Sequence, residues 1–311
     1  MKKSDQLLYD QLENALTKFI AEQHELPGIN GLHARDTLLR QFVDSVHRVK
    51  YPVLIRTRNL SQHRKDPSNE MFDPLKAALL HFREENSDEA YWLVFLFAHF
   101  GRHRKTGYLY ARCVYGRFGQ GGLWDWKSTS SNPAEFRKWL HDNQERLDAL
   151  PPGFGNHRKY ESLEAYSDKG TGATVETYVA WVEPPRSHQQ IFDEAIARAG
   201  GDVRKAFDIL YKSMKKVRRF GRLARFDFLA MIGKLGFAAI EPGSAYMGSA
   251  TGPVDGARLL FAGSSDAKIS SRELDELLIR LDLYLNVGTQ AIEDAVCNWQ
   301  KSPAVFKSFR G

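Results

Sequence analysis

Apolar residues recur at three- and four-residue intervals along most of the chain, and this periodicity constrains the fold more than any other feature. It is the spacing of one buried helix face, and it repeats in ten segments that are separated by short polar or glycine-containing breaks. Only 51–57 (YPVLIRT) and 257–263 (ARLLFAG) are typical of strands. The sequence therefore predicts a mainly α fold. The helical segments are 7–23, 34–49, 73–85, 87–101, 132–150, 188–200, 202–217, 225–237, 271–285 and 288–300.

The breaks between these segments give no sign of a flexible linker. Each is short or contains aromatic residues, and no motif repeats at a fixed interval. We expect a single helical unit over 1–311. The alternative division has an N-terminal helical subdomain over 1–68 and a core over 69–311.

Composition places the chain among ordinary globular proteins, with 42% hydrophobic and 26% charged residues over 311 positions. Its longest apolar stretch, 90–100, is too short to span a bilayer, so we expect a buried helix there. No apolar signal-peptide core follows the first residues, which favours a cytoplasmic protein without membrane contact. Cys113 and Cys297 lack neighbouring ligand-type residues, so neither a metal nor another cofactor is expected.

One short phrase occurs three times: FGRHRKTGY at 100–108, FGNHRKYES at 154–162 and FGRLARFDF at 220–228. A glycine lowers helix stability, so its repeated place before basic residues suggests a point where the backbone must turn or approach a ligand. Basic residues also favour helix ends, and one such block would be explained by that alone. Three blocks, each tied to Phe-Gly, favour a polyanion such as DNA, and the third of them belongs to an acid-free basic run at 209–226.

Two Pro-Gly turns are candidates for phosphate binding through backbone amides. They lie at 26–31 (LPGING) and 150–155 (LPPGFG), and each is equally explained as a plain turn between helices. The second is the better candidate because basic residues follow it directly. We expect DNA-contacting residues in these regions and in the glycine-rich loop 241–256, where Tyr246 could stack on a base. They are Arg102, His103, Arg104, Asn156, His157, Arg158, Lys159, Arg222, Arg225 and Tyr246.

Asp227 is the candidate catalytic residue. It is the acid that directly follows the basic run at 209–226, on a segment predicted to be helical. A carboxylate there could stabilise positive charge on a sugar or activate a nucleophile. The structural alternative is an ion pair with Arg222, Arg225 or Lys234.

The stretch from Phe220 to Phe261, together with FGNHRKYES and the closing EDAVCNWQKSPAVFKSFRG, resembles the α-glutamyl/putrescinyl thymine pyrophosphorylase family. The resemblance extends from RDTLLRQFVDSVHRVKYP at 35–52 to the C-terminus. It implies a helix-hairpin-helix fold of the DNA glycosylase superfamily, which extrudes a base from DNA, although the usual hairpin with its following aspartate is not clearly spelled. Members are linked to hypermodified thymine, and related proteins to removal of modified bases from phage DNA.

Three functions remain open at this point. The first is a DNA glycosylase that excises a modified or hypermodified pyrimidine and leaves an abasic site, in antiviral defence. The second is a transferase that displaces pyrophosphate from an activated hydroxymethyl pyrimidine. The third is a DNA-binding module without catalysis. In all three the partner is DNA, through its phosphate backbone and, for the enzymes, an extruded base; the sequence names no protein partner.

Overall fold

The computed structural model describes residues 2–308, apart from the side chain of Ser249. Within this part the chain is built of α- and 3₁₀-helices and contains no strand, which confirms the predicted mainly α class. Only two isolated β-bridges occur, His103 with Gly107 and Ser162 with Gly170. The two segments expected as strands are helical instead. Residues 51–55 continue a long helix through Pro52, and 257–262 lie inside another helix.

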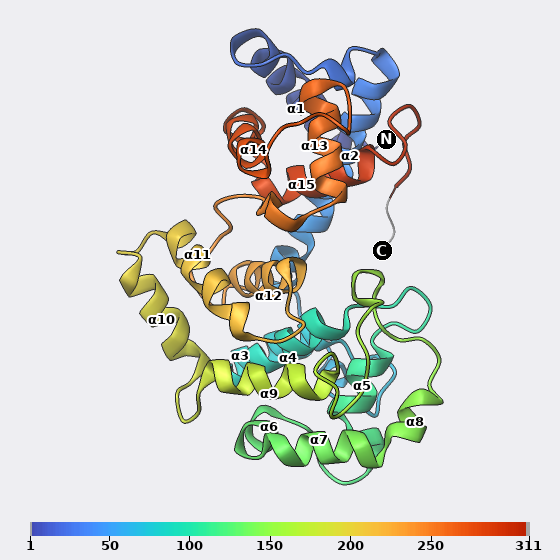
Figure 1. Ribbon diagram of the computed structural model, residues 1–311, viewed down its shortest axis with the longest axis vertical. Helices are drawn as coiled ribbons and strands as arrows, with labels where there is room; N and C mark the ends of the chain where they lie inside the picture. Colours follow the sequence, from blue (N-terminus) through green and yellow to red (C-terminus); the bar gives the residue numbers. More distant parts are fainter. Residues whose placement is uncertain (1, 309–311) are drawn as a thin grey trace. The chain divides into compact units, whose positions relative to one another are not determined.

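The helices form two compact units (Figure 1). Unit 1 combines the chain up to Tyr51 with the chain from Pro242 onward, and unit 2 runs from Pro52 to Glu241. The boundary between the units therefore falls inside α2, and unit 1 combines an N-terminal with a C-terminal segment. The alternative considered from sequence places a single boundary at residue 68. Unit 1 contains α1 (Lys3–Glu22), η1 (Pro27–Ile29), most of α2 (Leu32–Ile55), η6 (Met247–Ser249), α13 (Gly252–Ala262), α14 (Ser271–Leu285) and α15 (Thr289–Trp299).

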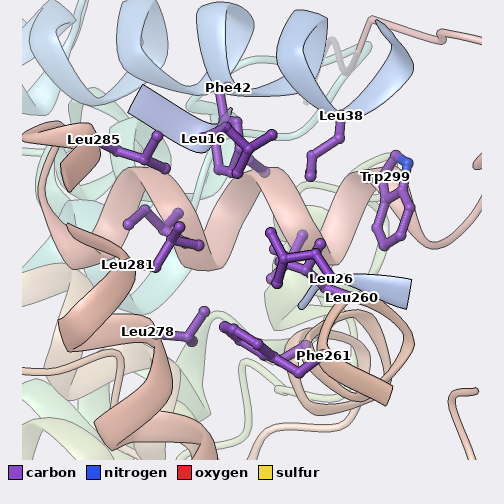
Figure 2. Packing of buried hydrophobic residues seen from close by; sticks show 14 of the residues in the cluster. Leu16, Leu26, Leu38, Phe42, Leu260, Phe261, Leu278, Leu281, Leu285 and Trp299 are labelled. Carbon is purple, nitrogen blue, oxygen red and sulfur yellow. The ribbon is translucent and has the colours of Figure 1, made fainter. Parts of the chain in front are cut away.

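The core of unit 1 is a leucine-rich cluster that draws on both ends of the chain (Figure 2). Leu16, Leu38 and Phe42 come from α1 and α2, while Leu281 and Trp299 come from α14 and α15, and all are completely or almost completely buried. Side chains of this size each contribute about 1.5–3 kcal/mol on burial, so neither end has a complete core alone.

The first Pro-Gly turn belongs to this core. A Cβ atom on Gly28 would lie 2.1 Å from the carbonyl oxygen of Leu259, so glycine is required for close packing of η1 on α13. This contact gives the turn a structural use.

Unit 2 holds the remaining helices. They are η2 (Gln62–Arg64), α3 (Pro74–Arg83), α4 (Ser87–Phe100), α5 (Leu109–Tyr115), η3 (Arg117–Gly119), α6 (Trp126–Ser131), α7 (Pro133–Asp142), α8 (Gln144–Asp148), η4 (Asn156–Arg158), α9 (Thr171–Val182), α10 (His188–Arg198), α11 (Val203–Ser213), η5 (Met214–Lys216) and α12 (Arg222–Leu235). Side-chain caps fix several helix starts. Asp73 accepts hydrogen bonds from the first turn of α3, and Asn132 does the same for α7.

Helix α4 is the centre of unit 2 and contacts α3, α5, α6, α10 and α12. Its apolar residues are buried on all sides, as expected for the stretch 90–100. The ring of Phe95 stacks on Tyr178 of α9 at 3.8 Å and lies 5.1 Å from Phe220, just before α12. The middle of α4 is therefore packed against α9 and against Phe220, which begins the third Phe-Gly phrase just before α12.

Candidate functional site

The first two Phe-Gly phrases touch through their backbones. The amide N–H of Gly155 donates a hydrogen bond to the carbonyl of Phe100 at 2.8 Å. Gly101 has φ +65°, and a Cβ atom there would lie 3.2 Å from the Cα of Gly155. The rings of Phe100 and Phe154 are 5.8 Å apart. Glycine is therefore needed in these two phrases because two backbones meet.

Arg158 joins the second phrase to the third. Its Nη2 donates to Oδ2 of Asp227 on α12 at 2.8 Å, and its Nε donates to the carbonyl of Ala98 near the end of α4 at 2.6 Å. Arg158 is only 7% exposed. Its guanidinium is thus committed inside the protein, and it presents almost no surface to a DNA phosphate, unlike the role we expected from sequence.

A second arginine, Arg219, also holds this loop. Nε of Arg219 donates to Oε2 of Glu161 at 2.8 Å, and its Nη2 donates to Oε1 of Glu161 and to the carbonyl of Tyr160, each at 3.1 Å. Hydrogen bonding to Glu161 raises the pKa of the Arg219 guanidinium further. Two arginines therefore anchor the loop between Arg158 and Glu161.

Asp227 lies partly open beside these clamps, with 30% of its side chain exposed. Oδ2 accepts from Arg158, and no hydrogen bond reaches Oδ1 within the described residues. Its ion-pair partner is thus none of the three residues considered from sequence. Arg225, for example, stacks over the ring of Tyr211 at 4.3 Å and donates to the carbonyl of Tyr211 at 3.0 Å.

His99 lies completely buried beneath the first two phrases, and sequence reasoning did not select it as a site residue. Burial, with smaller effects from Arg158 and Arg219, lowers its pKa to about 3. The hydroxyl of Thr171 donates to the carbonyl of Ser162 at 2.7 Å, so it must accept from Nε2 of His99 at 2.9 Å. His99 is therefore a neutral imidazole with its proton on Nε2, and it ties α4 to the start of α9.

The remaining candidate residues fall into three groups. The two loops that follow Gly101 and Gly155 lie side by side, and they expose Arg102, Arg104, Asn156, His157 and Lys159. His103 is half-buried, with Nδ1 at 2.8 Å from the Thr106 hydroxyl, which in turn donates to Pro152 at 2.8 Å. Arg222 and Arg225 are half-buried on α12.

Tyr246 belongs to unit 1, whereas the other candidate residues belong to unit 2. It is half-buried and adopts a left-handed conformation, φ 53° and ψ 50°, and its N–H donates to the Ser244 hydroxyl at 3.1 Å.

A helical hairpin that the sequence patterns did not single out precedes α12. Helices α10 and α11 pack together and are joined through Gly200 and Gly201, with φ +64° and +82° (Figure 1). Space around both glycines is open, and Asp202 caps α11 by accepting from the N–H groups of Arg204 and Lys205. The signal was present as the Gly-Gly pair between two helical segments.

Two further properties concern the described part of the chain only. No group of three or more histidine, cysteine, aspartate or glutamate side chains is arranged to hold a metal ion. No helix in that part has the length and apolar character needed to cross a membrane.

Comparison with protein families matches residues 33–311 to the model of alpha-glutamyl/putrescinyl thymine pyrophosphorylase clade 3. The chain belongs to this family. The clade 3 family is described by an activity on thymine, which relates the chain to enzymes of DNA base modification. The match confirms the resemblance drawn from the sequence, and it covers both Asp227 and the clamped loop. No curated protein and no solved structure shows significant similarity to the chain.

Proposed function

We propose that the chain is a DNA glycosylase that excises a hypermodified pyrimidine, with Asp227 as the catalytic carboxylate. The observation that carries this proposal is the position of Asp227. One of its oxygens is held by the buried Arg158, which belongs to one of two neighbouring loops that expose basic residues. No hydrogen bond within the described residues reaches the other oxygen. A carboxylate that is fixed but still has an accepting oxygen suits stabilisation of a positively charged sugar.

The basic loops fit the binding step of such a reaction. Arg102, Arg104 and Lys159 are exposed on neighbouring loops, where they would hold phosphates on either side of an extruded nucleotide. Extrusion costs a few kcal/mol, and these contacts would offset part of that cost. They carry no sequence information, so selection of the base would come from the pocket that receives it.

The chemical step follows from the free oxygen of Asp227. The C1′–N1 bond of the nucleotide breaks and its electron pair leaves with the base. The negative charge of Asp227 stabilises the positive sugar while the oxygen of a water molecule adds to C1′. The proton released from water ends on the departing base. This step leaves an abasic site.

The order of helices supports the same proposal. The superfamily implied by the resemblance places a catalytic aspartate after a helical hairpin. Here the α10–α11 hairpin with its Gly200-Gly201 turn is followed by α12, which carries Asp227.

A transferase is the second candidate, and the description of the family favours it. In that reaction an amine attacks the methylene carbon of an activated hydroxymethyl pyrimidine and pyrophosphate leaves. Asp227 would then accept the proton of the attacking amine.

One assay distinguishes the two reactions. The protein is incubated with phage DNA that carries hypermodified thymine and, separately, with an amine and DNA that carries the pyrophosphate-activated hydroxymethyl pyrimidine. Alkali-labile strand breaks, free base and released pyrophosphate are measured in both reactions. A glycosylase gives breaks and free base. Pyrophosphate release with intact glycosidic bonds would establish the transferase instead. No product of either kind, with DNA binding retained, would support a binding module without catalysis.

The same reaction separates hydrolysis from a lyase mechanism. A lyase would need a lysine amine to form a Schiff base, and Lys159 and Lys234 are the candidates in this region. Borohydride would then trap a covalent protein–DNA adduct, whereas the proposed water-dependent step gives none.

A further inference from the structure

Tyr160 is the most exposed aromatic side chain in the described part of the chain, with 78% of its surface accessible. A single exposed tyrosine is common and has no meaning alone. Its surroundings distinguish this one, because the residues on both sides of Tyr160 are anchored while its ring projects outward.

The backbone under Tyr160 is fixed at three points. Arg158 is held by Asp227 and Ala98, and its carbonyl accepts from the N–H of Glu161 at 2.9 Å. The carboxylate of Glu161 binds Arg219, which also donates to the carbonyl of Tyr160. An aromatic ring on such a rigid support loses little entropy on binding, which is what a stacking contact requires.

The charges on this loop and on the neighbouring loop indicate the class of ligand. Nζ of Lys159 lies 5.1 Å from the centre of the Tyr160 ring, and the exposed Arg102 and Arg104 lie on the adjoining loop. An aromatic ring with a lysine beside it and basic residues on a neighbouring loop is a combination that binds a base together with its phosphates. Tyr160 also lies only two residues from Arg158, the partner of Asp227.

We propose that Tyr160 is a base-stacking residue that enters the DNA duplex beside the extruded nucleotide. Its ring covers the face of the neighbouring base pair that extrusion exposes, and so stabilises the opened duplex. This inference rests on the proposed function, since it assigns Tyr160 a part in positioning the same nucleotide that Asp227 acts on. Tyr160 contacts the duplex and not the reacting bond.

The test uses binding to a duplex that lacks one base but has an unbroken backbone, here called the gapped duplex. The probes are a synthetic duplex with one nucleotide replaced by a tetrahydrofuran abasic analogue, and the same duplex intact. We expect the full-length protein to bind the gapped duplex more tightly. Tyr160→Ala should weaken binding to the gapped duplex by about 5- to 100-fold and change binding to the intact duplex little. Tyr160→Phe and Tyr160→Trp should retain the preference, because stacking does not need the hydroxyl.

Tyr166→Ala is the matched control. Tyr166 is also an exposed tyrosine of unit 2, with 58% of its surface accessible and an arginine, Arg137, over its ring. The Tyr166→Ala variant should bind both duplexes as the unmodified protein does. If Tyr160→Ala and Tyr166→Ala bind the gapped duplex equally well, or if Tyr160→Ala weakens both duplexes by the same factor, Tyr160 is not a stacking residue.

Failure of this inference and failure of the proposed function give different results. Binding to the gapped duplex requires no chemical step, so it can be measured with Asp227→Asn. If the protein releases no base, but Tyr160→Ala abolishes its preference for the gapped duplex, the stacking role of Tyr160 holds and the glycosylase activity does not. If Tyr160→Ala releases base normally and keeps the preference for the gapped duplex, the glycosylase activity holds and the stacking role of Tyr160 does not.

Discussion

Nη2 of Arg158 lies 2.8 Å from Oδ2 of Asp227, across 69 positions of sequence. The arginine is buried and the aspartate is partly open to solvent. A change at either residue therefore affects both the packing of the loop and the chemistry proposed for the carboxylate. Variants of this pair need matched controls that separate stability from activity.

Asp227→Asn should lower the rate of base release by ~10²–10⁴-fold, because it removes the charge and keeps the size of the side chain. Single-turnover formation of abasic sites measures this effect. Glu161→Gln is the control, since it also removes a carboxylate that pairs with an arginine, here Arg219. Full activity of Asp227→Asn, or an equal loss with Glu161→Gln, would remove Asp227 from the catalytic role.

Arg158→Ala should lower the free energy of unfolding of unit 2 by about 3–5 kcal/mol, because it deletes the buried partner of a carboxylate and of the Ala98 carbonyl. Lys159→Ala changes the exposed neighbouring residue and should cost less than about 0.5 kcal/mol. Urea denaturation followed by circular dichroism measures both. Similar midpoints for the two variants would contradict an internal role for Arg158.

Alanine should be tolerated differently by the glycines of the three Phe-Gly phrases. Gly101 has a positive φ, and a Cβ on Gly155 would lie 3.0 Å from the amide nitrogen of Arg102, so Gly101→Ala and Gly155→Ala should each cost about 1–3 kcal/mol. Gly221 has φ −67° and open space around it, so Gly221→Ala should be nearly neutral or slightly stabilising. Thermal unfolding of the three variants provides the measurement. A loss at Gly221 equal to that at Gly101 would contradict this difference.

Removing Arg102 and Arg104 together should reduce the salt dependence of DNA binding. Each lost phosphate contact lowers the slope of log K against log salt by about 0.9 on duplex DNA, so the double alanine variant should lose about 1.8. Lys127→Ala with Lys138→Ala removes the same charge from α6 and α7 and should change the slope much less. Equal slopes for the two double variants would show that the loops are not the contact surface.

Stability should depend on pH through Glu89. Burial raises the pKa of Glu89 to about 7, although the N–H of Trp126 and the hydroxyl of Tyr115 donate to its oxygens. The folded protein therefore keeps a proton that the unfolded chain loses near pH 4.5, and stability falls as pH rises from about 4.5 to 7. Glu89→Gln removes this contribution, so the difference in unfolding free energy between the two proteins should change by about 3 kcal/mol over that interval. A constant difference would mean that Glu89 is ionised throughout.

Local pattern was enough to predict many of the helices and part of their ends, but it missed α5, α6, α9 and α13. Asp73 and Asn132 cap α3 and α7 as their places before Pro74 and Pro133 indicate. The prediction of strands at 51–57 and 257–263 was wrong, because short aliphatic runs fit a strand and a buried helix equally well. Packing decides between them. Here 51–55 form the end of α2, and 257–262 lie inside α13.

The site was predictable only in outline. The repeated phrase indicated points where the backbone turns or makes a close approach, and such an approach is found at Gly101 and Gly155, although the approaching group is another backbone segment. The partner of Asp227 was sought within helical reach, at Arg222, Arg225 and Lys234, because sequence spacing reveals neighbours along a helix. Arg158 comes from a distant loop, and no local pattern encodes that contact. Whether Asp227 is catalytic stays a prediction.

The joining of both ends of the chain in unit 1 has a consequence for synthesis on the ribosome. Helix α1 packs against α14, and all of unit 2 is translated between them. At about 5–20 residues per second, the apolar faces of α1 and α2 wait about 10 to 40 seconds for their partners. Unit 2 emerges whole and can fold during that interval, whereas the nascent α1 and α2 present Leu16 and Phe42 to any chaperone that binds exposed apolar helices.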